Sequence, residues 1–218
     1  MADGTAFRLA PVGMPIGAFL DTTASEAMSM LLASSAFDVR LSQREAWEAE
    51  LEILRQSLDG VDGYIYLEFD VPRLGSRIDA VVVGGSVVVP IEFKVGALTY
   101  ERADYNQAWD YALDLKNFHE ASHGAAICPI LVATEAPSGD AEWRSAHADG
   151  VRPPARSNRS DLRRLLHQAL GDATGARIDG EAWGRAPYHP TPTISGGTRV
   201  VRTALGRGDF SQRRWSET

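Results

Sequence analysis

The sequence predicts an α/β fold in which helices flank a mixed sheet, and the spacing of its apolar residues along the chain is the basis of that prediction. Six segments give the order helix, strand, strand, strand, helix, strand: 42–58, 64–71, 77–83, 87–95, 101–122 and 127–133. The chain has 218 residues, 44% of them hydrophobic, and shows no repeat of fixed period. We therefore expect one main domain with a sizeable core.

Helical spacing begins near the N-terminus. The first 23 residues hold too many Pro and Gly for a long element, and a short helix is expected over 24–34. A longer helix is expected to begin at Ser42, because Ser42-Gln-Arg-Glu45 is a capping box. Apolar residues then follow at helical spacing from Trp47 until Gly60 ends the pattern.

Three strands are expected next. Segment 64–71 alternates with a period of two, which places its apolar residues on one face and its polar residues on the other. The apolar set is Ile65, Leu67, Phe69 and Val71. Segments 77–83 and 87–95 are joined around Gly84-Gly85-Ser86, which favours a hairpin.

The second half of the pattern is a helix followed by a buried strand. One side of the helix over 101–122 is apolar, and Gly124 is its expected stop. That side consists of Tyr105, Ala108, Trp109, Ala112, Leu115 and Phe118. The single cysteine, Cys128, lies in the strand over 127–133 and is interpreted as a small buried hydrophobe.

Charge divides the chain into an acidic body and a basic C-terminal part. Residues 1–150 carry 23 acidic and 10 basic side chains, whereas residues 151–218 carry 12 arginines and 6 acidic side chains. We expect an N-terminal extension over 1–40, a core over 41–150, and a loop-rich basic extension over 151–218 with one short helix, 160–170. Either this extension contacts phosphate groups, or it is a solvated tail. Its candidate contacts are Arg163, Arg164, Arg199, Arg202, Arg213 and Arg214.

Membrane attachment and secretion are not expected. No apolar run approaches the roughly 20 residues that span a bilayer. The first twenty residues lack the positive start and continuous apolar stretch of a secretory signal. We therefore expect a cytoplasmic protein without a membrane partner.

Three charged residues interrupt the two apolar strands of the hairpin, namely Asp79, Glu92 and Lys94. Buried strands rarely hold unpaired ions, because removing a lone carboxylate from water costs roughly several kcal/mol unless the carboxylate takes up a proton and becomes neutral. Alternation places Glu92 and Lys94 on one face. Asp79 joins them if the hairpin loop has two or four residues, or if a bulge, for which Pro90 is a candidate, corrects the register.

This trio suits metal-assisted chemistry at a phosphate. Two carboxylates fit a hard divalent cation such as Mg²⁺ or Mn²⁺, and an ammonium orients water or stabilises charge on a phosphoryl transition state. Only Lys94 and Lys116 are lysines among 22 basic residues, so a lysine at 94 calls for a reason. A structural salt bridge of Lys94 with Asp79 or Glu92 is the alternative.

Ile-Asp79, a turn, and Glu92-Phe-Lys94 together resemble the signature of the PD-(D/E)XK nuclease superfamily, with Ile78 where that name places Pro. The resemblance implies a restriction-endonuclease-like core and metal-dependent hydrolysis of phosphodiester bonds, in DNA more than in RNA. It implies that Asp79 and Glu92 are metal ligands and that Lys94 positions the attacking water. Glu50 is the candidate for a further acid from the preceding helix, with an ordinary surface Glu as the alternative.

Two further matches extend the resemblance. Gln107-Ala-Trp-Asp-Tyr111 resembles the Q-x-x-x-Y element of the RecB-like branch. Its spacing puts both side chains on one helical face, where they can hold a phosphate or the outer shell of the metal. An ordinary polar stripe on the helix is the alternative. The span 43–194 is similar to the N-terminal nuclease-like region of bacterial Schlafen group 3-like helicase proteins, most specifically over 109–119.

Those relatives continue into a G-x-x-x-x-G-K-[ST] phosphate loop, which this sequence lacks. A stand-alone nuclease and a truncated version of a longer protein are both open. We expect activity to depend on a separate ATPase or helicase partner or on a homodimer. Trp183, Tyr188 and Trp215 are candidate docking positions for such a partner, and packing back on the domain is the alternative for these three residues.

A rival motif points to a different enzyme class. His119-Glu120-Ala-Ser-His123 has the H-E-x-x-H pattern, which on a helix provides two zinc ligands and the general base of a metallopeptidase. Glu142 or His147 is at a suitable distance to be a third ligand. Gly124 follows at once, so packing at a helix end is the plainer interpretation. A module that binds nucleic acid or a partner on a nuclease fold without cutting is the third alternative.

Overall fold

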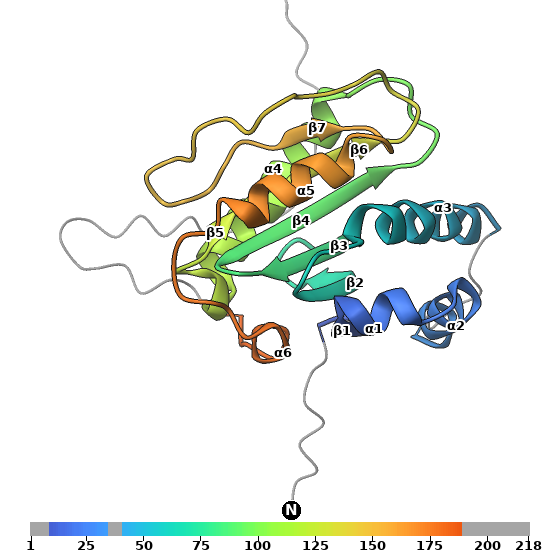
Figure 1. The fold of residues 1–218 in the computed structure, drawn as a ribbon, viewed down its shortest axis with the longest axis horizontal. Coiled ribbons are helices and arrows are strands. Elements are labelled where there is room, and N and C mark those ends of the chain that lie inside the picture. Colours follow the sequence, from blue (N-terminus) through green and yellow to red (C-terminus); the bar gives the residue numbers. More distant parts are fainter. Residues whose placement is uncertain (1–8, 35–40, 189–218) are drawn as a thin grey trace, which may run out of the picture.

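A mixed sheet of seven strands forms the centre of the computed structural model, which describes residues 9–34 and 41–188 (Figure 1). The strand order is β1-β2-β3-β4-β6-β7, with β5 also beside β4. The first four strands are antiparallel, whereas β4, β6 and β7 are parallel. The strands span Val12–Pro15 (β1), Tyr64–Val71 (β2), Ser76–Gly84 (β3), Val87–Lys94 (β4), Ala126–Ile127 (β5), Ile130–Ala133 (β6) and Ala155–Ser157 (β7). The predicted α/β class with a mixed sheet is confirmed.

Helices cover both faces of this sheet. Helices α1, α2, α3 and α5 pack on one face and α4 and α6 on the other, each over its own apolar cluster. The helices span Ile16–Asp21 (α1), Ala24–Ser34 (α2), Leu41–Leu58 (α3), Arg102–Phe118 (α4), Leu162–Gly171 (α5) and Gly180–Trp183 (α6), with a 3₁₀ turn η1 over Glu120–Ser122. Within the described ranges, no helix combines the length and the apolar character needed to cross a bilayer.

The main elements lie where the spacing predicts them, and the differences concentrate at their ends. Ser42 lies inside helix α3, which spans Leu41–Leu58, so the prediction that Ser42 caps this helix is wrong. Helix α4 ends at Phe118, because His119 has an extended backbone and η1 follows. The strand expected over 127–133 is divided into β5 and β6 by Cys128 and Pro129.

Short elements outside the core pattern were not expected. Strand β1 forms in the Pro- and Gly-rich start and pairs with β2, and β7 follows two prolines and pairs with β6. Helix α6 buries Trp183 completely against the α4 side of the sheet. Segments from both extensions therefore pack with the central strands.

The hairpin between β3 and β4 has a two-residue turn, which is one of the loop lengths that place Asp79 with Glu92 and Lys94. Gly84 pairs with Val87, so Gly85 and Ser86 make the turn, and Gly85 has a φ of +56° that favours glycine. Pro90 pairs regularly with Val81, so there is no bulge at this proline. Since Ala80 is paired with Ile91, the same register puts Asp79 across from Glu92.

Part-way along β2 and β3, the apolar side chains switch from one face of the sheet to the other. The prediction that all four apolar residues of β2 share one face is therefore wrong. Ile65 and Leu67 pack beneath α3, whereas Phe69 and Val71 pack beneath α4. The residue between the two pairs, Glu68, has a φ of +53°, and it is the one non-glycine residue of the described chain with a positive φ. This left-handed residue breaks the alternation of side chains along β2.

Candidate active site at the end of β4

Every residue predicted for the site lies between α3 and α4 around the carboxyl end of β4. Helix α3 contributes one acid, β3 and β4 contribute the strand trio, and α4 contributes an amide and a phenol. In that order the residues are Glu50, Asp79, Glu92, Lys94, Gln107 and Tyr111. They are linked by hydrogen bonds or by mutual effects on pKa.

The ammonium of Lys94 is held by three oxygen atoms from three side chains. Its Nζ lies 2.9 Å from Glu92 Oε1, 3.1 Å from Gln107 Oε1 and 3.5 Å from Asp104 Oδ1. Burial opposes its charge, but the hydrogen bond to Glu92 and the charges of Glu92 and Asp104 outweigh burial and raise the pKa of Lys94. Lys94 is therefore a fixed cation at neutral pH rather than a base.

Gln107 and Tyr111 extend this contact into a directed chain of hydrogen bonds. Gln107 accepts from Lys94 through Oε1 and donates through Nε2 to the Tyr111 hydroxyl at 2.8 Å. The hydroxyl donates in turn to the Arg77 carbonyl oxygen at 2.9 Å. An ammonium only donates and a carbonyl oxygen only accepts, so each polar hydrogen of the chain has one direction. Tyr111 is 2% exposed. The hydrogen bonds of Gln107 and Tyr111 thus connect the Lys94 ammonium to the backbone of β3.

Asp79 and Glu92 meet beside the lysine. Asp79 Oδ2 accepts a hydrogen bond of 2.7 Å from the backbone N–H of Phe93. Glu92 is 4% exposed, and its Oε2 has no hydrogen-bond partner among the described residues. Burial is the main cause that raises the pKa of both carboxyl groups, and for Asp79 the charges of Glu92 and Glu50 add to it. Such a pair is costly unless a cation neutralises it.

Glu50 faces the same cluster from α3. Burial, followed by the charges of Glu68 and Glu92, raises the pKa of Glu50 to about 8. A small cavity of about 10 Å³ separates α3 from the sheet at this point, roughly the room for one water molecule. The carboxylates that line it are Glu50, Glu68 and Asp79.

Glu68 is a fourth acid that sequence reasoning missed. It is 5% exposed, its Oε1 accepts from Trp47 Nε1 at 2.7 Å, and its Oε2 lies 3.2 Å from Arg77 Nε. The regular alternation of β2 places Glu68 among the polar residues of the strand, so the pattern does not indicate a buried acid at this position. A charged residue between Leu67 and Phe69, in register with Asp79, is the pattern that could have indicated it.

The donor set suits a hard divalent cation, although the carboxylates are not gathered around one point. Across residues 9–34 and 41–188, no three His, Cys, Asp or Glu side chains form a group arranged to hold a metal ion. Asp79 and Glu92 are in contact, and the unpartnered Oε2 of Glu92 is an oxygen of the kind that Mg²⁺ and Mn²⁺ bind. Glu50 is linked to this pair through electrostatics: its charge raises the pKa of Asp79, and the charge of Glu92 raises the pKa of Glu50.

The two histidines of the rival motif do not share an α-helical face. His119 follows the last residue of α4, and His123 follows η1. His119 is completely buried against Phe69 and Trp183, and its Nδ1 is 2.8 Å from Ser122 Oγ. Burial lowers the pKa of His119 to about 4. Packing at the helix end describes this histidine better than zinc ligation.

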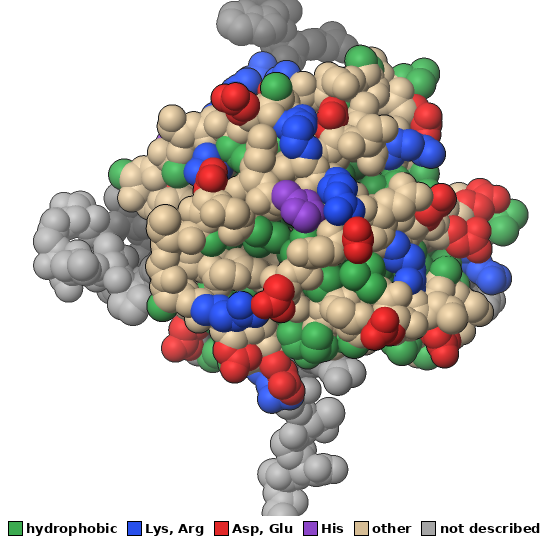
Figure 2. Space-filling model, in the orientation of Figure 1, with side chains coloured by type: hydrophobic (Ala, Val, Ile, Leu, Met, Phe, Trp, Pro, Cys, Tyr) green, Lys and Arg blue, Asp and Glu red, His purple; other side chains and the backbone are tan. Residues whose placement is uncertain are grey.

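The basic residues expected at phosphate groups fall into two sets. Arg163 lies 3.3 Å from Asp59, and Arg164 lies 3.4 Å from Asp161, so both are paired with acids. Figure 2 shows basic and acidic side chains interspersed on the face that carries α3 and α5. The other candidates of the extension lie outside the described residues: Arg199, Arg202, Arg213, Arg214 and Trp215.

Comparison with known proteins gives no relative. No protein-family model, no curated protein and no solved structure matches this chain.

Proposed function

We propose that this chain is a metal-dependent nuclease that hydrolyses phosphodiester bonds, with DNA favoured over RNA. The observation that carries the proposal is the fixed cation Lys94 beside Glu92. The second carboxylate oxygen of Glu92 is buried without a hydrogen-bond partner among the described residues, and Asp79 is its neighbour. The order α3-β2-β3-β4-α4-β6 supports a restriction-endonuclease-like core and the resemblance to the PD-(D/E)XK superfamily.

Asp79 and Glu92 are the proposed metal ligands, with Glu50 as the third acid. When bound, a Mg²⁺ or Mn²⁺ ion supplies Lewis acidity toward a phosphate oxygen and an acidified water. The three carboxyl groups hold protons more tightly than ordinary acids do, because burial raises the pKa of each, and the charges of neighbouring acids add to this effect for Asp79 and Glu50. A cation that takes the place of those protons would relieve their repulsion.

Lys94 is proposed to hold the attacking water and to stabilise the negative charge that develops on the phosphate. Its raised pKa suits electrostatic stabilisation, because the ammonium stays charged through the reaction. Gln107 and Tyr111 are positioning residues that fix the direction of the ammonium.

A cleavage assay on supercoiled plasmid tests the function. The full chain is incubated with Mg²⁺, with Mn²⁺ and with EDTA, beside the variants Asp79→Asn and Glu48→Gln. Glu48 is an exposed acid of α3 and is the matched control. We expect metal-dependent nicking or linearisation by the wild type and by Glu48→Gln, and none by Asp79→Asn. Binding of the plasmid without cleavage in either metal would instead favour the non-cleaving module.

A further inference from the structure

A row of aromatic and basic side chains lies on the flank of α4 that faces β7. Arg102, Tyr105 and Trp109 follow one another at helical spacing, so they share one side of α4. The sequence pattern places both rings in the buried face, but in the structure both are only half-buried. The buried residues of α4 are Ala108, Tyr111, Ala112, Asp114, Leu115 and Lys116.

The rings are close to one another and to two side chains from other segments. The Tyr105 and Trp109 ring centroids are 6.4 Å apart with an interplanar angle of 30°. The Arg156 guanidinium of β7 lies 5.6 Å from the Tyr105 centroid, and the exposed His147 ring lies 5.5 Å from that of Trp109. We call these residues the α4 strip: Arg102, Tyr105, Trp109, His147 and Arg156.

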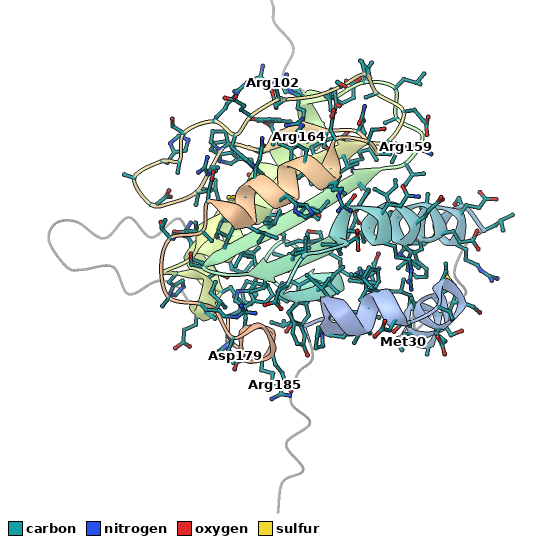
Figure 3. The ribbon with its side chains drawn as sticks, in the orientation of Figure 1. Met30, Arg102, Arg159, Arg164, Asp179 and Arg185 are labelled. Atoms are coloured by element: carbon teal, nitrogen blue, oxygen red, sulfur yellow. The ribbon has the colours of Figure 1, made fainter. Side chains whose placement is uncertain are left out.

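The two arginines of the α4 strip are Arg102 and Arg156, and both are exposed. Within the described part of the chain, neither Arg102 nor Arg156 takes part in a salt bridge. The nearby Asp140 accepts a hydrogen bond of 2.8 Å from the backbone N–H of Arg156, and no salt bridge joins it to the Arg156 guanidinium in the described part of the chain. By contrast, Arg159 is paired with Glu135. Figure 3 shows Arg102 at the same end of the molecule as Arg159 and Arg164 and far from Asp179 and Arg185.

The α4 strip adjoins the candidate active site. Asp104 and Gln107, which hold the Lys94 ammonium, lie on the same two turns of α4 as Tyr105 and Trp109. A ligand that runs along the strip would therefore approach the end of β4. Aromatic faces stack on nucleobases of any sequence, and unpaired arginines contact backbone phosphates.

We propose that the α4 strip binds a single strand of nucleic acid and leads it to the end of β4. A single strand is favoured over a duplex because the faces of duplex bases are already stacked on their neighbours and cannot cover Tyr105 or Trp109. The shared chemistry, a base face next to a phosphate, is present in DNA and RNA alike. The link to cleavage rests on the proposed function, whereas the binding itself does not.

Binding of short oligonucleotides to the full chain in EDTA tests the inference separately from catalysis. The probes are fluorescein-labelled oligo(dT), oligo(rU) and a duplex of equal length, titrated at several salt concentrations. We expect Trp109→Ala to weaken single-strand binding by about tenfold and to change duplex binding little. Arg156→Ala should reduce the slope of log K against log salt by about 0.7, the share of one phosphate contact on a single strand.

Matched controls separate the strip from general effects of mutation. Trp143→Ala removes a half-buried indole that bonds to Leu165 on the α5 side, and Arg177→Ala removes an exposed arginine paired with Asp62. Both should keep wild-type affinity and salt slope. The conservative Trp109→Phe should keep affinity within about threefold but lose most of the tryptophan quenching that base stacking causes, whereas Trp143→Phe should keep it.

The inference is overturned if Trp109→Ala and Arg156→Ala bind single strands as tightly as their controls do. It is also overturned if Trp109→Phe retains full quenching, or if the duplex binds as tightly as the single strand and is weakened equally by Trp109→Ala. Oligo(dT) binding without any cleavage of plasmid would leave the α4 strip standing and count against the nuclease alone. A preference between oligo(dT) and oligo(rU) identifies which single strand the strip receives.

Discussion

Glu68 of β2 lies opposite Asp79 of β3. On either side of this position, the apolar side chains of both strands pack on opposite faces of the sheet. Leu67 pairs with Ala80 and Phe69 with Ile78, so the two acids occupy the position between those pairs. Leu67 and Ala80 pack beneath α3, whereas Phe69 and Ile78 pack beneath α4. A left-handed non-glycine residue costs of the order of 1 kcal/mol, and such conformations persist where the surrounding structure fixes them.

Glu68 is expected to control the acidity of Glu50, which lines the same small cavity between α3 and the sheet. The charge of Glu68 is the second cause, after burial, that raises the pKa of Glu50 to about 8. Glu68→Gln should therefore lower the pKa of Glu50, measured by carbon NMR titration of the labelled carboxyl groups. An unchanged Glu50 titration in a folded Glu68→Gln protein would show that the two acids are not coupled.

Removing one acid should stabilise the metal-free protein. Glu50→Gln keeps the shape of the side chain and removes its mutual repulsion with the other carboxylates. We therefore expect a melting temperature a few degrees higher at pH 8, because each kcal/mol of added stability raises the melting temperature of a chain of this size by about 2–4 °C. Glu48→Gln is the exposed control on the same helix. A lower melting temperature for Glu50→Gln than for Glu48→Gln would contradict the repulsion.

The pH dependence of stability follows from the same group. The folded protein keeps the Glu50 proton until about pH 8, whereas the unfolded chain releases it near pH 4.5. The folded state thus binds more protons in this window, and stability falls as pH rises through it. Thermal melting of the metal-free protein from pH 5 to pH 8 should show this fall, and Glu50→Gln should flatten it. Added Mn²⁺ should restore the melting temperature at pH 8.

His119 should give the opposite dependence at lower pH. Burial lowers its pKa to about 4 from an ordinary value of 6.5, so the unfolded state binds the extra proton between these values. Stability should fall as pH drops through this window, by on the order of 2 kcal/mol. Urea unfolding of His119→Asn at pH 7 and pH 4.5 should show a smaller loss than the wild type. An equal loss would place the acid sensitivity elsewhere.

Tyr111→Phe should act through Lys94 rather than on substrate binding. The change removes the hydroxyl that accepts from Gln107 and donates to the Arg77 carbonyl, leaving two polar groups without their partner. We expect kcat to fall by about tenfold with KM nearly unchanged, since an orienting contact is lost. Steady-state cleavage of an oligonucleotide measures both constants. A rise in KM alone would mean that the hydroxyl binds substrate directly.

The order of elements and the strand trio could be predicted because each depends on local pattern. Strand β2 and helix α2 have the bounds that their spacing indicates, and Gly85 supports the tight turn that brings Asp79 across from Glu92. Tertiary context decides the rest. The left-handed backbone at Glu68 has no counterpart in a pattern that alternates regularly through it.

The short edge elements escaped prediction for a related reason. β1 and β7 have four and three residues, and Pro15 and Pro154 lie at or beside their ends, so neither has a periodicity to detect. Their partners in the sheet make them strands. The end of α4 also depends on tertiary context. The helical pattern alone continues past Phe118, but His119 has an extended backbone and its buried ring packs against Trp183.

The most direct test of the central claim compares the two lysines of the chain in a DNA cleavage assay with Mg²⁺. Lys94 contacts three side chains of the site. Lys116 lies in the last turn of α4, and its ammonium donates a hydrogen bond of 2.7 Å to the Ala125 carbonyl oxygen. We predict that Lys94→Met lowers the single-turnover cleavage rate by at least about 100-fold, the scale of one lost transition-state contact, while Lys116→Met stays near the wild type. Equal rates for wild type and a folded Lys94→Met would contradict the account.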